Sequence, residues 1–212
     1  MDAKLAKLAR QLNLRNGIQT GIKSIPPIIL MTDSQRLPDP VPAISRLPRG
    51  SMVIFRHYDH PNRPRIALAT RRACRQYGHL FVVANDLHLA RRLGADGDHF
   101  PEYHLWQDRA HLRTAKGNTI RTIACHSRQA LAKIIALPHA ARPDAVLISP
   151  VFTSLSHPDA PCLGLATFSK LAALARQNGL NPVALGGING KSVGTLVRSA
   201  VASLAGIGFS AN

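Results

Sequence analysis

The stretch 181-NPVALGGING-190, followed by a segment of helical composition and then by 202-ASLAGIGFS-210, contains the pattern that decides the fold. A short apolar run in each half ends on glycine, the first at Gly186 and Gly187 and the second at Gly208. Two buried strands joined by a helical crossover are typical of a parallel βαβ unit. Glycines at the carboxyl end of a strand let backbone N–H groups approach an anion, and the loops after strands seven and eight of (β/α)8 barrels commonly bind phosphate. The stretch therefore predicts a phosphate-binding cup, with an ordinary tight turn at the glycine pair as the alternative.

Six further apolar runs precede this unit, and each is followed by polar residues. Segments of helical composition separate most of them, which indicates a parallel sheet. We expect strands over 28–31, 52–55, 80–84, a very short one closing at 98–99, 119–124, 145–149, 183–185 and 202–209. Eight units predict a (β/α)8 (TIM) barrel, a minimal one because barrels typically need about 250 residues and this sequence has 212.

The helical segments complete the predicted barrel. An amphipathic helix is expected over 1–13, since Leu5, Ala9 and Leu12 share one face with Leu8. The sequence ends two residues after strand eight, so we expect no eighth outer helix and predict that the N-terminal helix takes its place, near where strand eight meets strand one. This divides a single domain into an N-terminal helix with its linker, 1–24, and a barrel, 25–212. Further helices are expected over 64–77, 87–93, 104–115 and 128–137, and in a segment ending at Asn178.

The amino-acid composition indicates in which cellular compartment the protein works. Three cysteines without CxxC spacing favour a reducing compartment over a disulfide framework or structural zinc. No apolar run approaches the roughly 20 residues of a membrane helix, and the N-terminus lacks the apolar core of a secretory signal. We therefore expect a cytoplasmic protein with no membrane partner.

The charge is the one extreme property. The formal net charge is +16, from 27 basic and 11 acidic residues, and such a field attracts anions. However, the basic residues are spread along the chain without a long run, and aromatic residues make up only 5%, which leaves little for base stacking. We expect a small phosphorylated metabolite as partner, with nucleic acid unfavoured and a homodimer left open.

The strand ends carry an ordered series of short motifs: LMTD (30–33), FRHYD (55–59), AND (84–86), GADGDH (94–99), CHS (125–127), SPVFTS (149–154), ALGGI (184–188) and GFSA (208–211). The series resembles the superfamily of thiamine phosphate synthases and thiazole tautomerases over about 28–211. The resemblance implies a (β/α)8 barrel that handles a thiazole phosphate in thiamine biosynthesis.

The resemblance to the synthase is incomplete. The synthase, a transferase, couples a pyrimidine pyrophosphate to thiazole phosphate with Mg²⁺. Its Gln-x-Arg-x-Lys motif appears here as 54-IFRHY-58, which keeps Arg56 without the glutamine and the lysine. Asn85 is kept as a substrate contact, and Asp86 as a metal ligand if Mg²⁺ is used. Other family positions are changed: the second magnesium-binding aspartate falls near His104, the serine on strand five near Ala124, and the lysine after strand six on His157.

The phosphate half of the site is better preserved. Ser154 and Ser156 keep hydroxyls where the family has threonines near the thiazole phosphate, and Gly187, Gly208 and Ser210 keep the backbone cup. The resemblance therefore implies binding of a monophosphate more than of a pyrophosphate, which needs clustered cations and carboxylates.

His126 is the candidate catalytic residue. It takes the position of the histidine that, in thiazole tautomerases, moves the proton that aromatises the ring. Imidazole can accept and return a proton near pH 7, although a packing role would also explain a histidine there. No cofactor is required for this reaction.

Two alternatives stay open. One is a synthase in which Arg56, His57, His104 and His157 replace the lost lysines, and it would depend on Mg²⁺. The other is a non-catalytic barrel that binds anions or nucleic acid, recognisable by a steep salt dependence. His57, His99, His104, His126 and His157 all fall at or just after strand ends, where solvation or phosphate binding is favoured over a zinc site.

Overall fold

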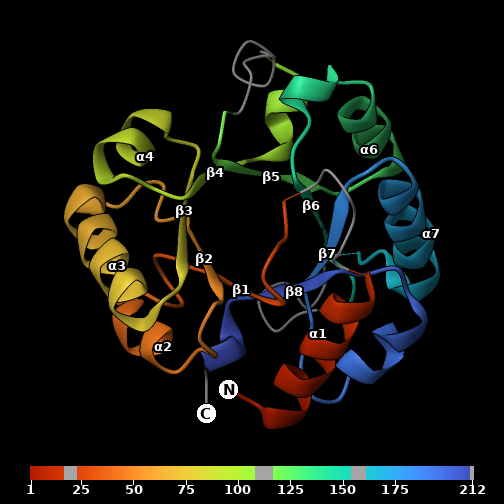
Figure 1. Ribbon diagram of the computed structural model, residues 1–212, viewed down its shortest axis with the longest axis horizontal. Coiled ribbons are helices and arrows are strands. Elements are labelled where there is room, and N and C mark those ends of the chain that lie inside the picture. The colour runs from red at the N-terminus through yellow and green to blue at the C-terminus, as the bar shows by residue number, and fades with distance from the viewer. Residues whose placement is uncertain (17–22, 108–116, 154–160, 211–212) are drawn as a thin grey trace.

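The protein is a closed eight-stranded parallel barrel with its helices on the outside (Figure 1). The computed structural model describes residues 1–16, 23–107, 117–153 and 161–210. Each strand pairs in parallel with the next one along the chain, and β8 returns to pair with β1. The expected (β/α)8 barrel is thereby confirmed. Its strands are β1 (Ile28–Met31), β2 (Met52–Phe55), β3 (Leu80–Ala84), β4 (Gly97–Phe100), β5 (Ile120–Cys125), β6 (Ala145–Ile148), β7 (Asn181–Leu185) and β8 (Ser203–Gly206).

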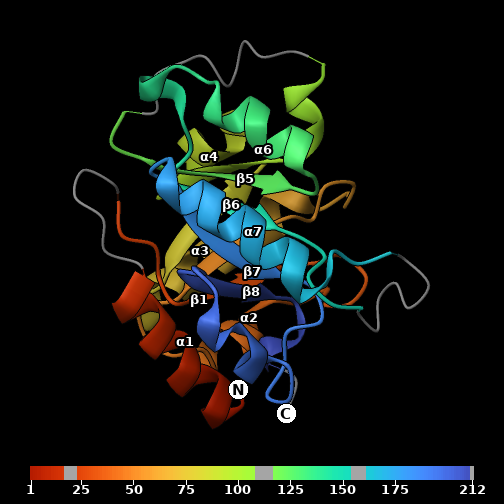
Figure 2. The ribbon, with the colours of Figure 1, turned by 90° about the vertical axis from the view of Figure 1, so that its right-hand side faces the viewer.

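The outer layer consists of α-helices and short 3₁₀ helices (Figure 2). None of the helices in the described residues is long and apolar enough to cross a membrane. Side-chain caps mark the start of some of them: Asp86 accepts the Leu89 N–H and Ser127 accepts the Ala130 N–H. The helices are α1 (Ala3–Asn16), α2 (Val41–Ser45), α3 (Arg63–Tyr77), α4 (Leu87–Leu93), η1 (Glu102–Leu105), α6 (Arg128–Ile135), η2 (His139–Ala141), α7 (Gly164–Gln177), η3 (Val193–Arg198) and η4 (Gly208–Ser210).

Two elements differ from the sequence-based expectation. Most of a third, the helix expected over 104–115, lies outside the described residues, which contain the 3₁₀ helix η1 at its start. The crossover between β7 and β8 is the 3₁₀ helix η3, whose glycine and β-branched residues are weak α-helix formers. Strand β8 ends at Gly206, not at Phe209, because the chain turns there: a Cβ on Gly206 would lie 2.7 Å from the Phe209 ring.

Helix α1 closes the barrel surface beside β8, as predicted (Figure 1). It packs against η3 and β8 and is held there by side-chain amides. Asn13 Nδ2 donates to the carbonyls of Ile25 (2.8 Å) and Ala202 (2.9 Å), and Asn16 Nδ2 donates to that of Val201 (2.8 Å). These hydrogen bonds satisfy buried backbone carbonyls between α1 and the amino ends of β1 and β8.

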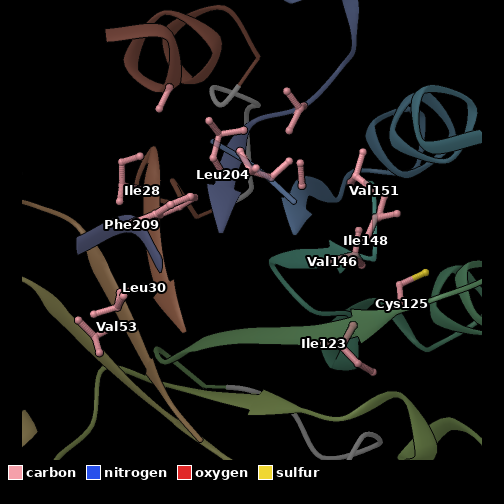
Figure 3. Close-up of a cluster of buried hydrophobic side chains, with 14 of the residues drawn as sticks. Ile28, Leu30, Val53, Ile123, Cys125, Val146, Ile148, Val151, Leu204 and Phe209 are labelled. Atoms are coloured by element: carbon pink, nitrogen blue, oxygen red, sulfur yellow. The ribbon is translucent and has the colours of Figure 1, made fainter. Parts of the chain in front are cut away.

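The core has two layers because alternate residues of each strand face opposite sides. In β1, Ile28 and Leu30 belong to the outer layer beneath the helices, part of which Figure 3 shows, and Ile29 and Met31 belong to the barrel interior. Both faces are buried, which is why the strands read as continuous apolar runs. The interior layer is Ile25, Ile29, Met31, Met52, Ile54, Val82, Ala84, Ile120, Ala145, Leu147, Val183 and Ala205.

Candidate active site

A cavity of about 470 Å³ opens at the carboxyl end of the barrel strands. Active sites of (β/α)8 barrels occupy this end of the fold. The alternation of the strands continues into the cavity, so that Arg56, His99 and His126 take inward positions. The described residues that line it are Met31, Arg56, Tyr58, His99, Pro101, Glu102, Tyr103, Trp106, Ala124, His126, Leu147, Ser149 and Leu185.

Arg56 is the only arginine or lysine among the described residues of the cavity wall. Thr32 holds it twice: Arg56 N–H donates to Thr32 Oγ1 (2.9 Å) and Arg56 Nε donates to the Thr32 carbonyl (3.0 Å). Arg56 Nη2 also lies 3.7 Å from Asp33 Oδ2. Burial lowers the pKa of Arg56, and the nearby Tyr58 and Asp33 oppose that shift. The guanidinium remains charged at neutral pH and is positioned to pair with an anion.

His57 lies on the opposite side of the strand and does not line the cavity. Its ring stacks on Phe55, with centroids 4.9 Å apart and planes 6° apart, and is fully buried. Nε2 lies 3.2 Å from the Pro38 carbonyl, which can only accept, so Nε2 carries the proton and Nδ1 accepts from Thr32 Oγ1 (3.0 Å). Burial lowers the pKa of His57. His57 therefore supports Thr32 and Arg56 and does not provide a cation to a ligand.

His126 faces the cavity with one nitrogen already engaged. Its Nδ1 lies 2.9 Å from the Ser149 carbonyl, which can only accept, and 3.2 Å from Ser149 Oγ, so we assign the Nδ1 proton to the shorter contact, with the carbonyl. In the neutral ring Nε2 is then the unprotonated nitrogen, able to accept a proton. The His126 backbone N–H donates to the carboxylate of Glu102, which ties the residue after β5 to η1.

His99 forms part of the buried wall of the cavity. Its Nδ1 lies 2.9 Å from Thr122 Oγ1. Burial, with smaller effects of Arg56 and His126, lowers the pKa of His99 to about 3. His99 is therefore neutral at physiological pH and can provide a hydrogen bond but no charge.

Asn85 connects the loop after β3 to the aromatic rim of the cavity. It adopts a positive φ of 56°, a conformation that asparagine tolerates better than most residues. Its Nδ2 donates to Tyr103 Oη (2.7 Å) and its Oδ1 accepts from His104 Nε2 (2.6 Å), while the Tyr103 and His104 rings stack 4.6 Å apart. Asn85 thus orients Tyr103 at the rim, next to the half-exposed Trp106.

Asp86 is committed to structural contacts. Its Oδ2 lies 2.6 Å from Arg63 Nη1, and its Oδ1 caps α4. Within the described ranges, no group of three or more His, Cys, Asp or Glu side chains could hold a metal ion. Asp86 thus already has two partners within the protein.

The glycine pair after β7 allows a close approach of the segment after β6. Both glycines have positive φ, and a Cβ on Gly187 would lie 2.4 Å from the Thr153 carbonyl oxygen. Phe152 N–H donates to the Gly186 carbonyl (3.2 Å). Gly187 and Gly208 are not among the described residues that line the cavity. Gly208 and the backbone of Ser210 belong to η4, whereas Ser154, Ser156 and His157 lie outside the described residues.

Sequence reasoning missed several residues of the cavity wall. Glu102, Tyr103 and Trp106 follow β4, and their position just after a strand end was the available signal. Tyr58 replaces the lysine of the synthase motif and lines the cavity, where burial raises its pKa. Ser149 is a buried residue whose carbonyl orients His126.

Comparison with known proteins identifies the family. A family model described as thiamine monophosphate synthase matches residues 30–208. The chain belongs to this family. A thiamine-phosphate synthase of Chromobacterium violaceum is 34% identical over 154 residues, which cover 71% of this chain and 69% of that protein. One of Alcanivorax borkumensis is 29% identical over 185 residues, covering 82% and 80%.

A solved structure also matches the fold. Thiamine phosphate pyrophosphorylase from Pyrococcus furiosus aligns with a TM-score of 0.66 at 20% identity, over 91% of this chain and 87% of that chain. The identity is too low to compare the sites, so this likeness supports the barrel alone. Membership of the family confirms the resemblance read from the motifs and makes this barrel one of thiamine biosynthesis.

Proposed function

We propose that this member of the thiamine monophosphate synthase family binds a thiazole phosphate and transfers a proton within its ring, with His126 as the proton carrier. The observation that carries the proposal is the hydrogen bond from His126 Nδ1 to the Ser149 carbonyl (2.9 Å), which leaves Nε2 as the basic nitrogen of the neutral ring. A 1,3-proton shift needs one group that accepts and returns a proton near neutral pH, and imidazole has this property.

In this reaction His126 returns as many protons to the substrate as it removes. His126 Nε2 removes a proton from one ring position, the ring electrons shift, and the resulting imidazolium returns the proton to another position. No atom is gained or lost, and nothing is oxidised or reduced. The Ser149 carbonyl accepts from Nδ1 throughout, so the ring keeps its orientation while it is charged. Metal is not needed for any of these steps.

The rest of the cavity supports a small anionic heterocycle. Tyr58, Tyr103 and Trp106 provide aromatic surface for a flat ring, and Arg56 provides one positive charge in the described cavity wall. Lys133 Nζ lies over the Trp106 ring, 3.7 Å from its centroid. One guanidinium suits a monophosphate or a carboxylate, whereas a pyrophosphate with Mg²⁺ calls for several cations and paired carboxylates. Asp86, the retained candidate for a metal ligand, is bonded to Arg63.

The second candidate function is thiamine phosphate synthesis. The observation that favours it is the name shared by the relatives, such as the thiamine-phosphate synthase of Chromobacterium violaceum at 34% identity. This function would require ligands for pyrophosphate beyond Arg56, the only arginine or lysine in the described cavity wall, and a metal ion at or near Asp86, whose carboxylate already contacts Arg63.

Binding and turnover distinguish the two functions. We would titrate the protein calorimetrically with thiazole phosphate carboxylate and, separately, with the pyrimidine pyrophosphate plus Mg²⁺. The proposal expects binding of the first without metal, and incorporation of solvent deuterium into the thiazole. His126→Asn should retain binding and lose exchange by a factor of about 10² or more, whereas the exposed His139→Asn should behave like the unmodified protein.

Three results would contradict the proposal. Product formation that depends on Mg²⁺ and on the pyrimidine pyrophosphate would make the synthase the function. If His126→Asn exchanges deuterium as fast as the unmodified protein, His126 is not the proton carrier. If the protein binds neither ligand, the remaining hypothesis is the non-catalytic barrel that binds anions or nucleic acid.

A further inference from the structure

The outer face of α3 and α4 carries five exposed arginines, which we call the arginine patch: Arg65, Arg72 and Arg75 on α3, and Arg91 and Arg92 on α4. At 3.6 residues per turn, the three arginines of α3 fall within about a quarter of the helix circumference and span about 15 Å along its axis. Helices α3 and α4 are in contact, and they lie side by side in Figure 1. The sequence has no lysine between 24 and 115, so arginine provides all the fixed positive charge of this region.

Among the described residues, the nearby carboxylates leave most of the patch unneutralised. Asp86 pairs with Arg63 (2.6 Å) and Asp96 pairs with Arg71 (3.0 Å), while Asp98 attracts Arg91 without forming an ion pair with it. Asp96 also accepts the Phe81 N–H at 2.8 Å. None of the five patch arginines forms an ion pair with another described residue. The patch therefore presents several guanidinium groups to solvent at once.

Arg49 extends the patch at the end of α3. The helix ends at Gly78, which has a φ of 71°, and a Cβ there would lie 3.1 Å from Arg49 Nε. Gly50 N–H donates to the Gly78 carbonyl (3.1 Å), which fixes this approach. The cationic side chain thus lies over the carboxyl end of α3, where the helix dipole favours it.

The patch lies away from the cavity. Helix α3 ends just before β3 begins at Leu80, and α4 ends shortly before β4 begins at Gly97. The carboxyl ends of both helices therefore lie at the amino end of the strands, whereas the cavity lies at their carboxyl end. Four of the five arginines occupy the second half of their helix, so a ligand on the patch would not block the cavity.

We propose that the arginine patch binds the phosphodiester backbone of duplex nucleic acid without regard to sequence. Guanidinium groups bind phosphate oxygens with two parallel hydrogen bonds, a geometry that lysine cannot offer. The spread of arginines along the sequence had argued against this partner, but the fold gathers them on one face.

The composition of the face selects duplex nucleic acid over two other polyanions. Single strands are held by aromatic stacking platforms, whereas the exposed large apolar side chains of α3 are Leu68 and, at its end, Tyr77, whose ring stacks with His79. A helix that lies on a membrane needs an apolar face of several large residues. Phosphate contacts alone suffice for a duplex backbone.

The test is fluorescence anisotropy with a labelled mixed-sequence duplex of about 20 base pairs, titrated at several salt concentrations. Five phosphate contacts predict a slope of log K against log salt of about −4.5, which weakens binding about 500-fold between 50 and 200 mM salt. Arg72→Gln/Arg75→Gln should reduce the slope by about 1.8 and weaken binding at least tenfold at low salt. The matched control, Lys4→Gln/Lys7→Gln, removes the same charge from exposed positions of α1 and should change binding less than twofold.

Circular dichroism and the melting temperature check that both double variants fold. Equal losses in the two variants would overturn the proposal, because binding would then follow net charge and not the patch. If the protein binds anionic phospholipid vesicles but not the duplex, the proposal is wrong and the partner of the patch is a membrane surface. Thiazole phosphate should not displace the duplex, and displacement would place the duplex at the cavity, which overturns the proposal while leaving the proposed function intact.

Discussion

Replacing Thr32 by valine tests how the protein positions its cavity cation. Thr32 Oγ1 is fully buried and has two partners, since it donates to His57 Nδ1 (3.0 Å) and accepts from the Arg56 N–H (2.9 Å). Valine has the same shape without the hydroxyl, so both partners lose their hydrogen bond while the packing is kept.

The cost follows from these two contacts. A buried polar group that loses its partner costs about 1–3 kcal/mol, so Thr32→Val should lower the free energy of unfolding by about 3 kcal/mol. For a chain of this size, that corresponds to a melting temperature lower by about 6–12 °C. Thr32→Ser keeps the hydroxyl and loses only a methyl group, at about 1 kcal/mol.

Urea denaturation of both variants measures the difference, and titration with thiazole phosphate reports on Arg56. We expect Thr32→Val to be the less stable variant and to bind the ligand more weakly than Thr32→Ser does. If the two variants are equally stable and bind equally well, the hydroxyl does not hold His57 and Arg56, and the argument fails.

Two further predictions concern Gly187 and the buried histidines. Gly187→Ala should destabilise the fold by about 2–4 kcal/mol, because φ is 66° and the new methyl would meet the Thr153 carbonyl, whereas Gly194→Ala, with no atom within 4 Å, should change the urea midpoint little. The free energy of unfolding should fall as pH is lowered from about 6.5 towards 3, because burial holds the pKa of His99 at about 3 and the unfolded chain then binds the extra proton. The lowered pKa of His57 acts in the same direction. Urea titrations at several pH values should show a flatter dependence in His99→Gln, and an unchanged slope would contradict this assignment.

The local pattern of the sequence was sufficient to predict the barrel. Strands β1, β2 and β3 have the predicted bounds, as does α4, because a parallel strand buried on both faces is a continuous apolar run between polar residues. The prediction weakened where the local signal is weak. Helix η3 and the end of β8 depend on Gly194 and on how Phe209 packs back on Gly206, which no periodicity encodes.

In the candidate site, too, local sequence predicted some residues but not the contacts between distant ones. Arg56 and His126 could be predicted because they follow strands directly, and the alternation of a strand decides which side chains face inward. Nothing local indicates that Glu102 reaches the backbone of His126, or that Arg63 takes up the carboxylate of Asp86.

Only the tertiary structure decided these pairings and the gathering of the arginines on α3 and α4. Strand and helix periodicity is a property of neighbouring residues, and the sequence by itself therefore determined which elements form and which of their faces are buried. Contacts between residues far apart in the chain depend on how those elements pack around one core, and that packing determines which charges meet, which are left exposed, and what the cavity can bind.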